Sequence, residues 1–201
     1  MRAVVAPHEN DRIGPNAIIQ VLEALTAEFG QASTAAFFES IGLGAHSASR
    51  PRDMVAERDV AVLQASLRER FGVDVATVIS REAGRRTGDY LLTHRIPRRA
   101  QQLLRWMPAA LAARILARAI ARHAWTFAGS GSFHVIAGRP FVFSIRHNPM
   151  CSMIRSATPS CDYYAATFER IFQAIVHPNA TVTETQCESM GAPACVFEVC
   201  W

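Results

Sequence analysis

Apolar residues recur at helical spacing over most of the chain and give way to alternating patterns toward its end. This periodicity predicts four helices in the first half, over 17–29, 33–41, 53–70 and 75–94. Gly30 ends the first, Asp53 is the expected N-cap of the third, and Gly72 separates the last two. The stretch 42–51, rich in Gly, Ser and Pro, is typical of a loop.

Shorter and more basic helical stretches follow, because Ile96-Pro97 ends the fourth helix and Pro108 interrupts what comes after it. Between 108 and 125 the predicted apolar side comprises Leu111, Ile115, Leu116, Ala119 and Ile120. Arg114, Arg118 and Arg122 repeat every four residues as a basic stripe. Such a stripe is typical of a helix lying on an anionic surface and equally of an ordinary solvated helix face.

Strand patterns dominate the rest of the chain. A hairpin is predicted from 133–137 and 141–145 around Gly138-Arg139-Pro140, then a helix over 162–177, a strand over 180–185 and a returning strand from 195. Helices followed by hairpins indicate an α+β fold, with N-terminal helices packed on a mostly antiparallel sheet. We expect a helical region over 1–75 and a second region over 76–201, joined in one compact unit.

Composition is that of a folded chain of 201 residues, of which 50% are hydrophobic. No apolar run reaches the roughly 20 residues of a membrane span, and residues 1–10 are too short an apolar run for a signal peptide, so a cytoplasmic location is expected. From Arg81 to Arg122 the sequence contains ten arginines and only two acidic residues, Glu82 and Asp89. This charge favours an anionic partner, with contact at the inner membrane surface as one alternative. No nucleic-acid-binding motif is present, so no nucleic acid partner is expected.

Four residues near the C-terminus have the chemistry of a metal site: Cys161, Glu184, Cys187 and Cys195. The start of one helix and both arms of the last hairpin bring them together, provided that the strand bends between Glu184 and Cys187. Three thiolates and one carboxylate suit a tetrahedral, structural Zn²⁺ and leave no open position for a catalytic water. Buried free thiols and disulfides are the alternatives. Cys151 and Cys200 are expected to be small buried hydrophobic residues outside the site.

Gly84 and Gly88 lie four residues apart in the predicted helix 75–94 and therefore share one face. Each costs about 1 kcal/mol in helix propensity relative to alanine. The pair predicts that another backbone or a flat ligand approaches the helix closely there.

The block from Cys161 to Phe197 resembles the 4-vinyl reductase domain, in which a cysteine opens a helix and Glu-x2-Cys precedes a Gly and a Cys leading into the last strand. Glu82-Ala-Gly84-Arg-Arg-Thr-Gly88 resembles the glycine-bearing helix of that family, so the resemblance spans about 76–199. The same domain forms the sensing part of phenol-responsive activators, where the matching positions bind zinc. The resemblance implies a fold like that of nitric-oxide sensors and Golgi-transport subunits, with a ligand pocket between helices and sheet.

Length and the helical N-terminus are most similar to family members of bacteriochlorophyll biosynthesis. The resemblance thus implies a Mg-porphyrin ligand, pigment-biosynthesis enzymes as partners, and binding and delivery of a Mg-tetrapyrrole intermediate. Homodimerisation stays open. A vinyl reductase acting on divinyl protochlorophyllide is the alternative that the family name suggests, and a sensor of small aromatics is another. The sequence has no Gly-x-Gly-x-x-Gly after a strand and no iron–sulfur cysteine run, so a site for a hydride donor is not evident.

A tetrapyrrole requires aromatic walls, an axial ligand for magnesium and cations for its carboxylates. His123 is the preferred axial ligand, with His94, His134 and His147 as alternatives. The candidate walls are Trp125, Phe133 and Phe141, with Trp106, Phe127 and Phe143 as further aromatic residues, and the candidate cations are Arg118 and Arg122, with Arg85 and Arg86 as alternatives. Each residue is also consistent with an ordinary core or surface position.

Overall fold

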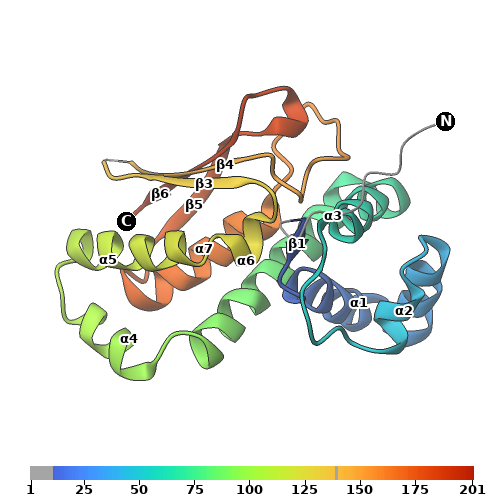
Figure 1. Cartoon of the computed structure of the whole chain (residues 1–201), viewed down its shortest axis with the longest axis horizontal. Helices are drawn as coiled ribbons and strands as arrows, with labels where there is room; N and C mark the ends of the chain where they lie inside the picture. The colour runs from blue at the N-terminus through green and yellow to red at the C-terminus, as the bar shows by residue number, and fades with distance from the viewer. Residues whose placement is uncertain (1–10, 139) are drawn as a thin grey trace.

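Helices and strands follow the order expected for an α+β fold (Figure 1). The structure is a computed structural model that describes residues 11–138 and 140–201. Its helices are α1 (Asn16–Ser40), α2 (Gly44–Ala48), α3 (Glu57–His94), α4 (Arg98–Arg105), α5 (Ala109–Arg122), α6 (Trp125–Ala128), α7 (Asp162–Ile175) and the 3-10 helix η1 (Glu188–Met190). Its strands are β1 (Arg12–Ile13), β2 (Val55–Ala56), β3 (Ser132–Ile136), β4 (Phe141–Arg146), β5 (Thr181–Gln186) and β6 (Cys195–Cys200). Residues 1–10, which bear on the signal-peptide expectation, and Arg139 of the predicted turn lie outside the described residues.

The main sheet has the order β3-β4-β6-β5, and every neighbouring pair is antiparallel. Both predicted hairpins form, and the second strand of one pairs with the second strand of the other, with Phe143 opposite Phe197. Phe141, Phe143, Phe197 and Val199 are buried, whereas the intervening residues of β4 and β6 are more exposed. Helices α5, α6 and α7 lie below the sheet in Figure 1, so the buried aromatic face is the one that they cover.

Helix α7 is buried on nearly all sides because it lies between the sheet and α3. Phe168 packs against Phe143 and Phe197 of the sheet. On the opposite side, Gly84 of α3 faces the backbone of α7, and Thr167 donates a hydrogen bond of 3.0 Å to the Gly84 carbonyl oxygen. The two-glycine motif therefore serves a helix–helix contact.

Two glycines interrupt the long helices as predicted. Gly30 (φ 80°) kinks α1 and Gly72 (φ 81°) kinks α3, and both have the left-handed φ that glycine adopts without strain. The expected region boundary at residue 75 falls just after the second kink.

Three predictions for the helical part of the chain were wrong in detail. Asp53 is not the N-cap of the third helix, since α3 begins at Glu57 and the preceding β2 pairs with β1. The loop predicted for 42–51 contains the short helix α2. On α5 the buried residues are Ala112, Ala113, Leu116 and Ala117, whereas Leu111 and Ile115 are exposed. The small alanines allow close packing, so the buried side of α5 is rotated away from the largest apolar residues.

None of the helices in the described residues is long and apolar enough to cross a membrane.

Candidate metal centre and ligand-binding surface

Four cysteine thiols lie close together in the structure: Cys151, Cys161, Cys187 and Cys195. All four are buried, and their Sγ atoms lie within 4.8 Å of one another. None of the chain's five cysteines is disulfide-bonded, and Cys200 is exposed rather than buried as expected. The structure therefore adds Cys151 to the predicted cysteines of the site.

The spacing of the sulfurs fits a tetrahedral thiolate site. Cys195 Sγ lies 3.5 Å from Cys151 Sγ, 3.6 Å from Cys161 Sγ and 3.7 Å from Cys187 Sγ, and the Cys161–Cys187 distance is 3.7 Å. Four Zn–S bonds of about 2.3 Å directed to the corners of a tetrahedron place neighbouring sulfurs about 3.8 Å apart. These four distances are close to those that such an ion requires.

Each cysteine is positioned by a different local feature. Cys161 is the N-cap of α7, where the helix dipole favours a thiolate. Cys195 begins β6, and Cys151 lies in the loop after β4. Glu184 pairs with Phe197 and Gln186 with Val196, so one extra residue bulges from β5 between them. This irregularity is the bend that the Glu184–Cys187 spacing predicts.

Glu184 lies at the edge of the cluster. Its Oε2 accepts a hydrogen bond of 2.7 Å from the backbone N–H of Cys161. Its Oε1 is buried and has no hydrogen-bond partner among the described residues. Burial, reinforced by the neighbouring Cys187 thiolate, raises the pKa of Glu184 to about 8. The Glu184 carboxyl group therefore holds the backbone of Cys161 at the start of α7 and keeps its second oxygen buried.

Polar groups around the cluster point their hydrogens at sulfur. Asn148 Nδ2 lies 3.2 Å from Cys161 Sγ, Ser189 Oγ lies 3.1 Å from Cys187 Sγ, and the Glu188 N–H lies 3.4 Å from Cys195 Sγ. Donors aimed at sulfur stabilise thiolates and orient them for a metal. The surroundings thus match metal-bound thiolates better than inert buried thiols.

The thiols do not ionise independently. Hydrogen bonds from Cys151, Cys161 and Cys195 lower the pKa of Cys187 far below that of a free thiol. Burial raises the pKa of Cys161, and hydrogen bonding with Cys151 raises that of Cys195.

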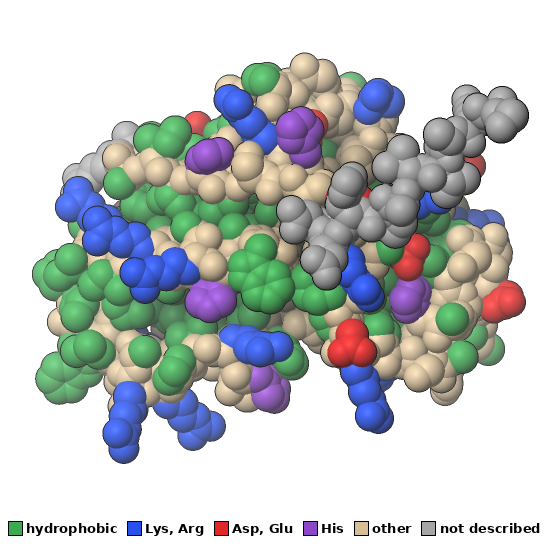
Figure 2. Space-filling model, in the orientation of Figure 1, with side chains coloured by type: hydrophobic (Ala, Val, Ile, Leu, Met, Phe, Trp, Pro, Cys, Tyr) green, Lys and Arg blue, Asp and Glu red, His purple; other side chains and the backbone are tan. Residues whose placement is uncertain are grey.

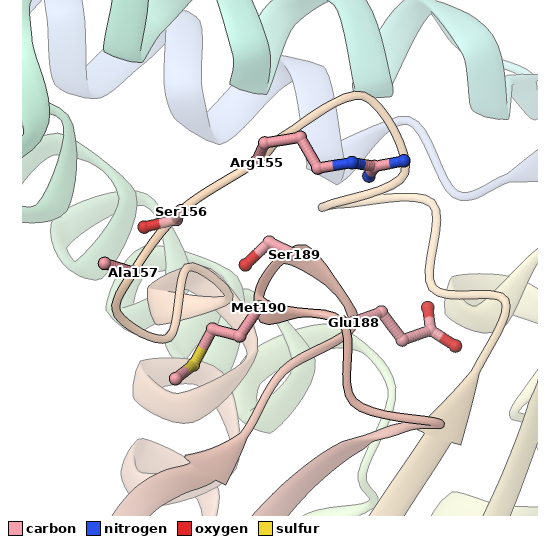
Figure 3. A pocket seen from close by; sticks show the side chains of 7 residues that line it. Arg155, Ser156, Ala157, Glu188, Ser189 and Met190 are labelled. Carbon is pink, nitrogen blue, oxygen red and sulfur yellow. The ribbon is translucent and has the colours of Figure 1, made fainter.

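An open hollow of about 610 Å³ lies beside this cluster, between residues 155–157 and 188–191 (Figure 3). Ser189 lines it and also donates to Cys187, so the hollow is one side chain away from the sulfurs. Glu188 also lines it, but its two carboxylate oxygens accept 2.7 Å bonds from the N–H groups of His147 and Asn148. Its charge is thereby used to hold the loop that carries Cys151.

The predicted pigment-site residues separate into two groups. Arg118, Arg122, His123 and Trp125 are exposed at the end of α5 and the start of α6, with Trp125 62% exposed. Nδ1 of His123 lies 2.9 Å from the Ala119 carbonyl oxygen. That contact places the ring proton on Nδ1 and leaves Nε2 as the nitrogen able to coordinate a metal.

The other two predicted aromatic walls, Phe133 and Phe141, lie deeper. Phe133 is half-buried, with its ring 5.3 Å from Phe127 and 6.0 Å from Phe168. Phe141 is buried against Phe143, Phe172 and Trp201, and so belongs to the core in this structure. The alternative histidines His94, His134 and His147 are all exposed on other elements.

Comparison with known proteins identifies the family. The chain is 46% identical to the bacteriochlorophyll synthase 23 kDa chain of Cereibacter sphaeroides, over 94% of this chain and 90% of that protein. It is 38% identical to the bacteriochlorophyll synthase 23 kDa chain of Rhodobacter capsulatus, over 97% of this chain and 90% of that protein. The chain belongs to the bacteriochlorophyll synthase 23 kDa chain family. Residues 141–200 match the V4R domain, a segment that contains the whole cysteine cluster and Glu184.

The fold of this member of the 23 kDa chain family is similar to that of an H-NOX protein, solved in a study titled "Probing the function of heme distortion in the H-NOX family". The TM-score is 0.54 with 12% identity, over 93% of this chain and 94% of that chain. This similarity confirms the expected nitric-oxide-sensor fold class.

Cys151 is the residue of the cysteine cluster that the sequence did not indicate. It lies in a long loop, so no strand or helix periodicity relates it to Cys161. The neighbouring Asn148 is the structural link, because its side chain accepts from the Met150 N–H and donates to Cys161 Sγ. An Asn-Pro turn just before a cysteine was the only available signal.

Proposed function

We propose that this protein binds a Mg-tetrapyrrole intermediate of bacteriochlorophyll biosynthesis and delivers it to the enzymes of the pathway. The main support is its 46% identity, over 94% of the chain, to the bacteriochlorophyll synthase 23 kDa chain. Such intermediates are flat, poorly soluble and anionic at their carboxylates, so a carrier must offer both aromatic and cationic contacts.

The exposed end of α5 offers such contacts. Arg118 and Arg122 are four residues apart and share one side of α5, and Trp125 begins the next helix, α6, three residues later. Neither arginine has an ion-pair partner among the described residues. A macrocycle stacked on Trp125, with Phe133 as a deeper wall, would place its carboxylates near these guanidinium groups.

His123 would supply the axial nitrogen. Its Nδ1 is held by the Ala119 carbonyl oxygen and the residue is exposed, so Nε2 would be the coordinating nitrogen. Neutral imidazole is a suitable ligand for a metal carried by a porphyrin. In this arrangement the magnesium arrives with the pigment and is not a resident metal of the protein.

The cysteine cluster has a separate, structural role in the proposal. We infer that it binds one Zn²⁺ through Cys151, Cys161, Cys187 and Cys195, with Glu184 holding the Cys161 backbone beside the ion. Four sulfur ligands close the coordination shell, so the ion would stabilise the junction of α7 with the hairpin rather than activate a substrate. The carboxylate as fourth ligand, as the sequence predicts, is the alternative.

A vinyl reductase remains the competing function because it would act on the same class of pigment. Reduction of a vinyl group needs a hydride donor, and the sequence contains no dinucleotide fingerprint after a strand. Binding and delivery require no donor, so we favour them.

The test is titration of the purified protein with Mg-protoporphyrin monomethyl ester, followed by the Soret absorbance. Wild-type protein should give a saturable shift. Arg118→Glu with Arg122→Glu, and separately His123→Ala, should each weaken binding about tenfold or more. The matched control, Arg52→Glu with Arg70→Glu, makes the same charge change on other exposed positions and should leave the titration within about twofold. Equal effects of the two double variants would refute the site.

A further inference from the structure

The corner between α4 and α5 exposes large apolar side chains that the fold does not need. Trp106 is 91% exposed and Leu103 61%, and on the first turns of α5 Leu111 and Ile115 are also exposed. Figure 2 shows hydrophobic side chains gathered at this end of the molecule, at the left of the view, with arginines above and below them. We call these four residues, with Arg98, Arg99 and Arg114, the α4–α5 corner.

Hydrogen bonds from α4 to neighbouring segments hold the α4–α5 corner in place. Gln101, which is buried, donates from Nε2 to the carbonyl oxygens of Leu92 (2.6 Å) and Ile96 (2.8 Å) at the end of α3. Arg105 Nε donates 2.7 Å to the Ala174 carbonyl oxygen of α7. These bonds tie α4 to two helices, so Trp106 is presented to solvent from a fixed support.

Its charge is of one sign. From Arg95 to Arg122 the sequence has seven arginines and no Asp or Glu. None of the seven has a carboxylate within ion-pair distance among the described residues. By contrast, Arg81, Arg85 and Arg86 on α3 are all paired with carboxylates. The seven unpaired arginines are therefore available to bind an anionic surface outside the chain.

From this arrangement we infer that the α4–α5 corner docks on an anionic lipid membrane surface. Tryptophan is favoured at the depth of lipid headgroups, where its ring is apolar and its N–H stays hydrated. Leucine and isoleucine side chains on short helices enter the acyl boundary while neighbouring arginines contact phosphates. Neither helix can cross a bilayer, so the protein would lie on the membrane and detach from it reversibly.

A bilayer explains the pattern better than the other anionic partners do. The charged residues of α4 and α5 are all arginines, which suits a uniformly anionic surface, whereas the rim of a protein interface presents polar groups in general. Nucleic acid would use the arginines but would leave Leu103, Leu111 and Ile115 in water. The inference does not rest on pigment binding, because the corner's residues are outside the proposed pigment site.

The experiment is cosedimentation of the purified chain with phosphatidylcholine vesicles, with or without about one quarter phosphatidylglycerol. Binding should require the anionic lipid and weaken as salt rises. Arg98→Gln with Arg99→Gln should weaken it about 30-fold, since each lost arginine removes about 1 kcal/mol. Trp106→Ala should weaken it about tenfold by removing the inserted ring. All three side chains are exposed, so circular dichroism and Tm should stay unchanged.

Two matched controls sharpen the result. Arg52→Gln with Arg70→Gln removes the same charge elsewhere, and Val78→Ala removes an apolar side chain that is 63% exposed on α3. Both should bind vesicles within about twofold of wild type. The inference is overturned if anionic vesicles do not sediment the protein, if the corner variants match these controls, or if a duplex oligonucleotide binds more tightly than the vesicles at equal salt.

Discussion

Gly84 of α3 packs directly against the backbone carbonyl of Tyr163 on α7. A Cβ at position 84 would overlap that oxygen and lie 3.0 Å from the Ala166 Cβ. One turn later, a Cβ at Gly88 would lie 2.7 Å from the Cβ of Arg170. The contact matters for the metal centre because Cys161 is the N-cap of α7. The packing of α7 against α3 therefore helps to set the position of that thiol.

Gly84→Ala should therefore destabilise the protein, although alanine is the better helix former by about 1 kcal/mol. We expect a net loss of about 2 kcal/mol in the free energy of unfolding, because the methyl group forces the helices apart. Val78→Ala on the same helix is the control and should change stability by less than about 0.5 kcal/mol, since Val78 is exposed. Urea denaturation followed by circular dichroism measures both, and a more stable Gly84→Ala would contradict the close contact.

Removal of one cysteine of the cluster should release metal and lower stability together. Cys187→Ser is expected to lose about one equivalent of zinc and about 4 kcal/mol, a fall in Tm of roughly 8–16 °C for a chain of this size. Cys200→Ser, at an exposed position, should retain both metal and Tm. Elemental analysis and calorimetry on the two variants check this prediction. Metal-free wild-type protein with an unchanged Tm would show that the cluster is not a structural metal site.

The fourth ligand can be identified by X-ray absorption at the zinc edge. We expect four sulfurs at about 2.3 Å in the wild type and in Glu184→Gln, whose amide oxygen can still accept from the Cys161 N–H. Cys151→Ser should reduce the count to three sulfurs and one lighter atom. Three sulfurs and one oxygen in the wild type, with the oxygen lost in Glu184→Gln, would instead assign the carboxylate as the ligand.

The sequence predicted those parts of the fold that repeat a regular pattern. Both hairpins, the helix that follows Cys161 and the breaks at Gly30 and Gly72 are where periodicity and turn chemistry placed them. The Glu184–Cys187 spacing even predicted an irregular strand, and β5 has a bulge there. Local pattern was sufficient because these features depend on residues close together in sequence.

Features that depend on long-range packing were not predictable in this way. The loop that carries Cys151 is held by Glu188 from a distant segment, so the cysteine's place in the cluster has no local signature. On α5, Leu111 and Ile115 are more hydrophobic than alanine, so a hydrophobic pattern places them on the buried side. The residues that face the core are instead Ala112, Ala113 and Ala117. That rotation also exposes Leu111 and Ile115, which the sequence pattern placed on the apolar side of the helix.

The most direct test of the proposed function combines binding and turnover on one sample. Purified protein is mixed with a divinyl Mg-pigment and NADPH, and the Soret band, the NADPH absorbance and the extracted pigment are followed together. We predict a saturable Soret shift, unchanged NADPH and recovery of the divinyl pigment intact. Consumption of NADPH with conversion of the vinyl group would contradict the carrier function and establish a reductase, and the absence of any Soret shift would contradict pigment binding itself.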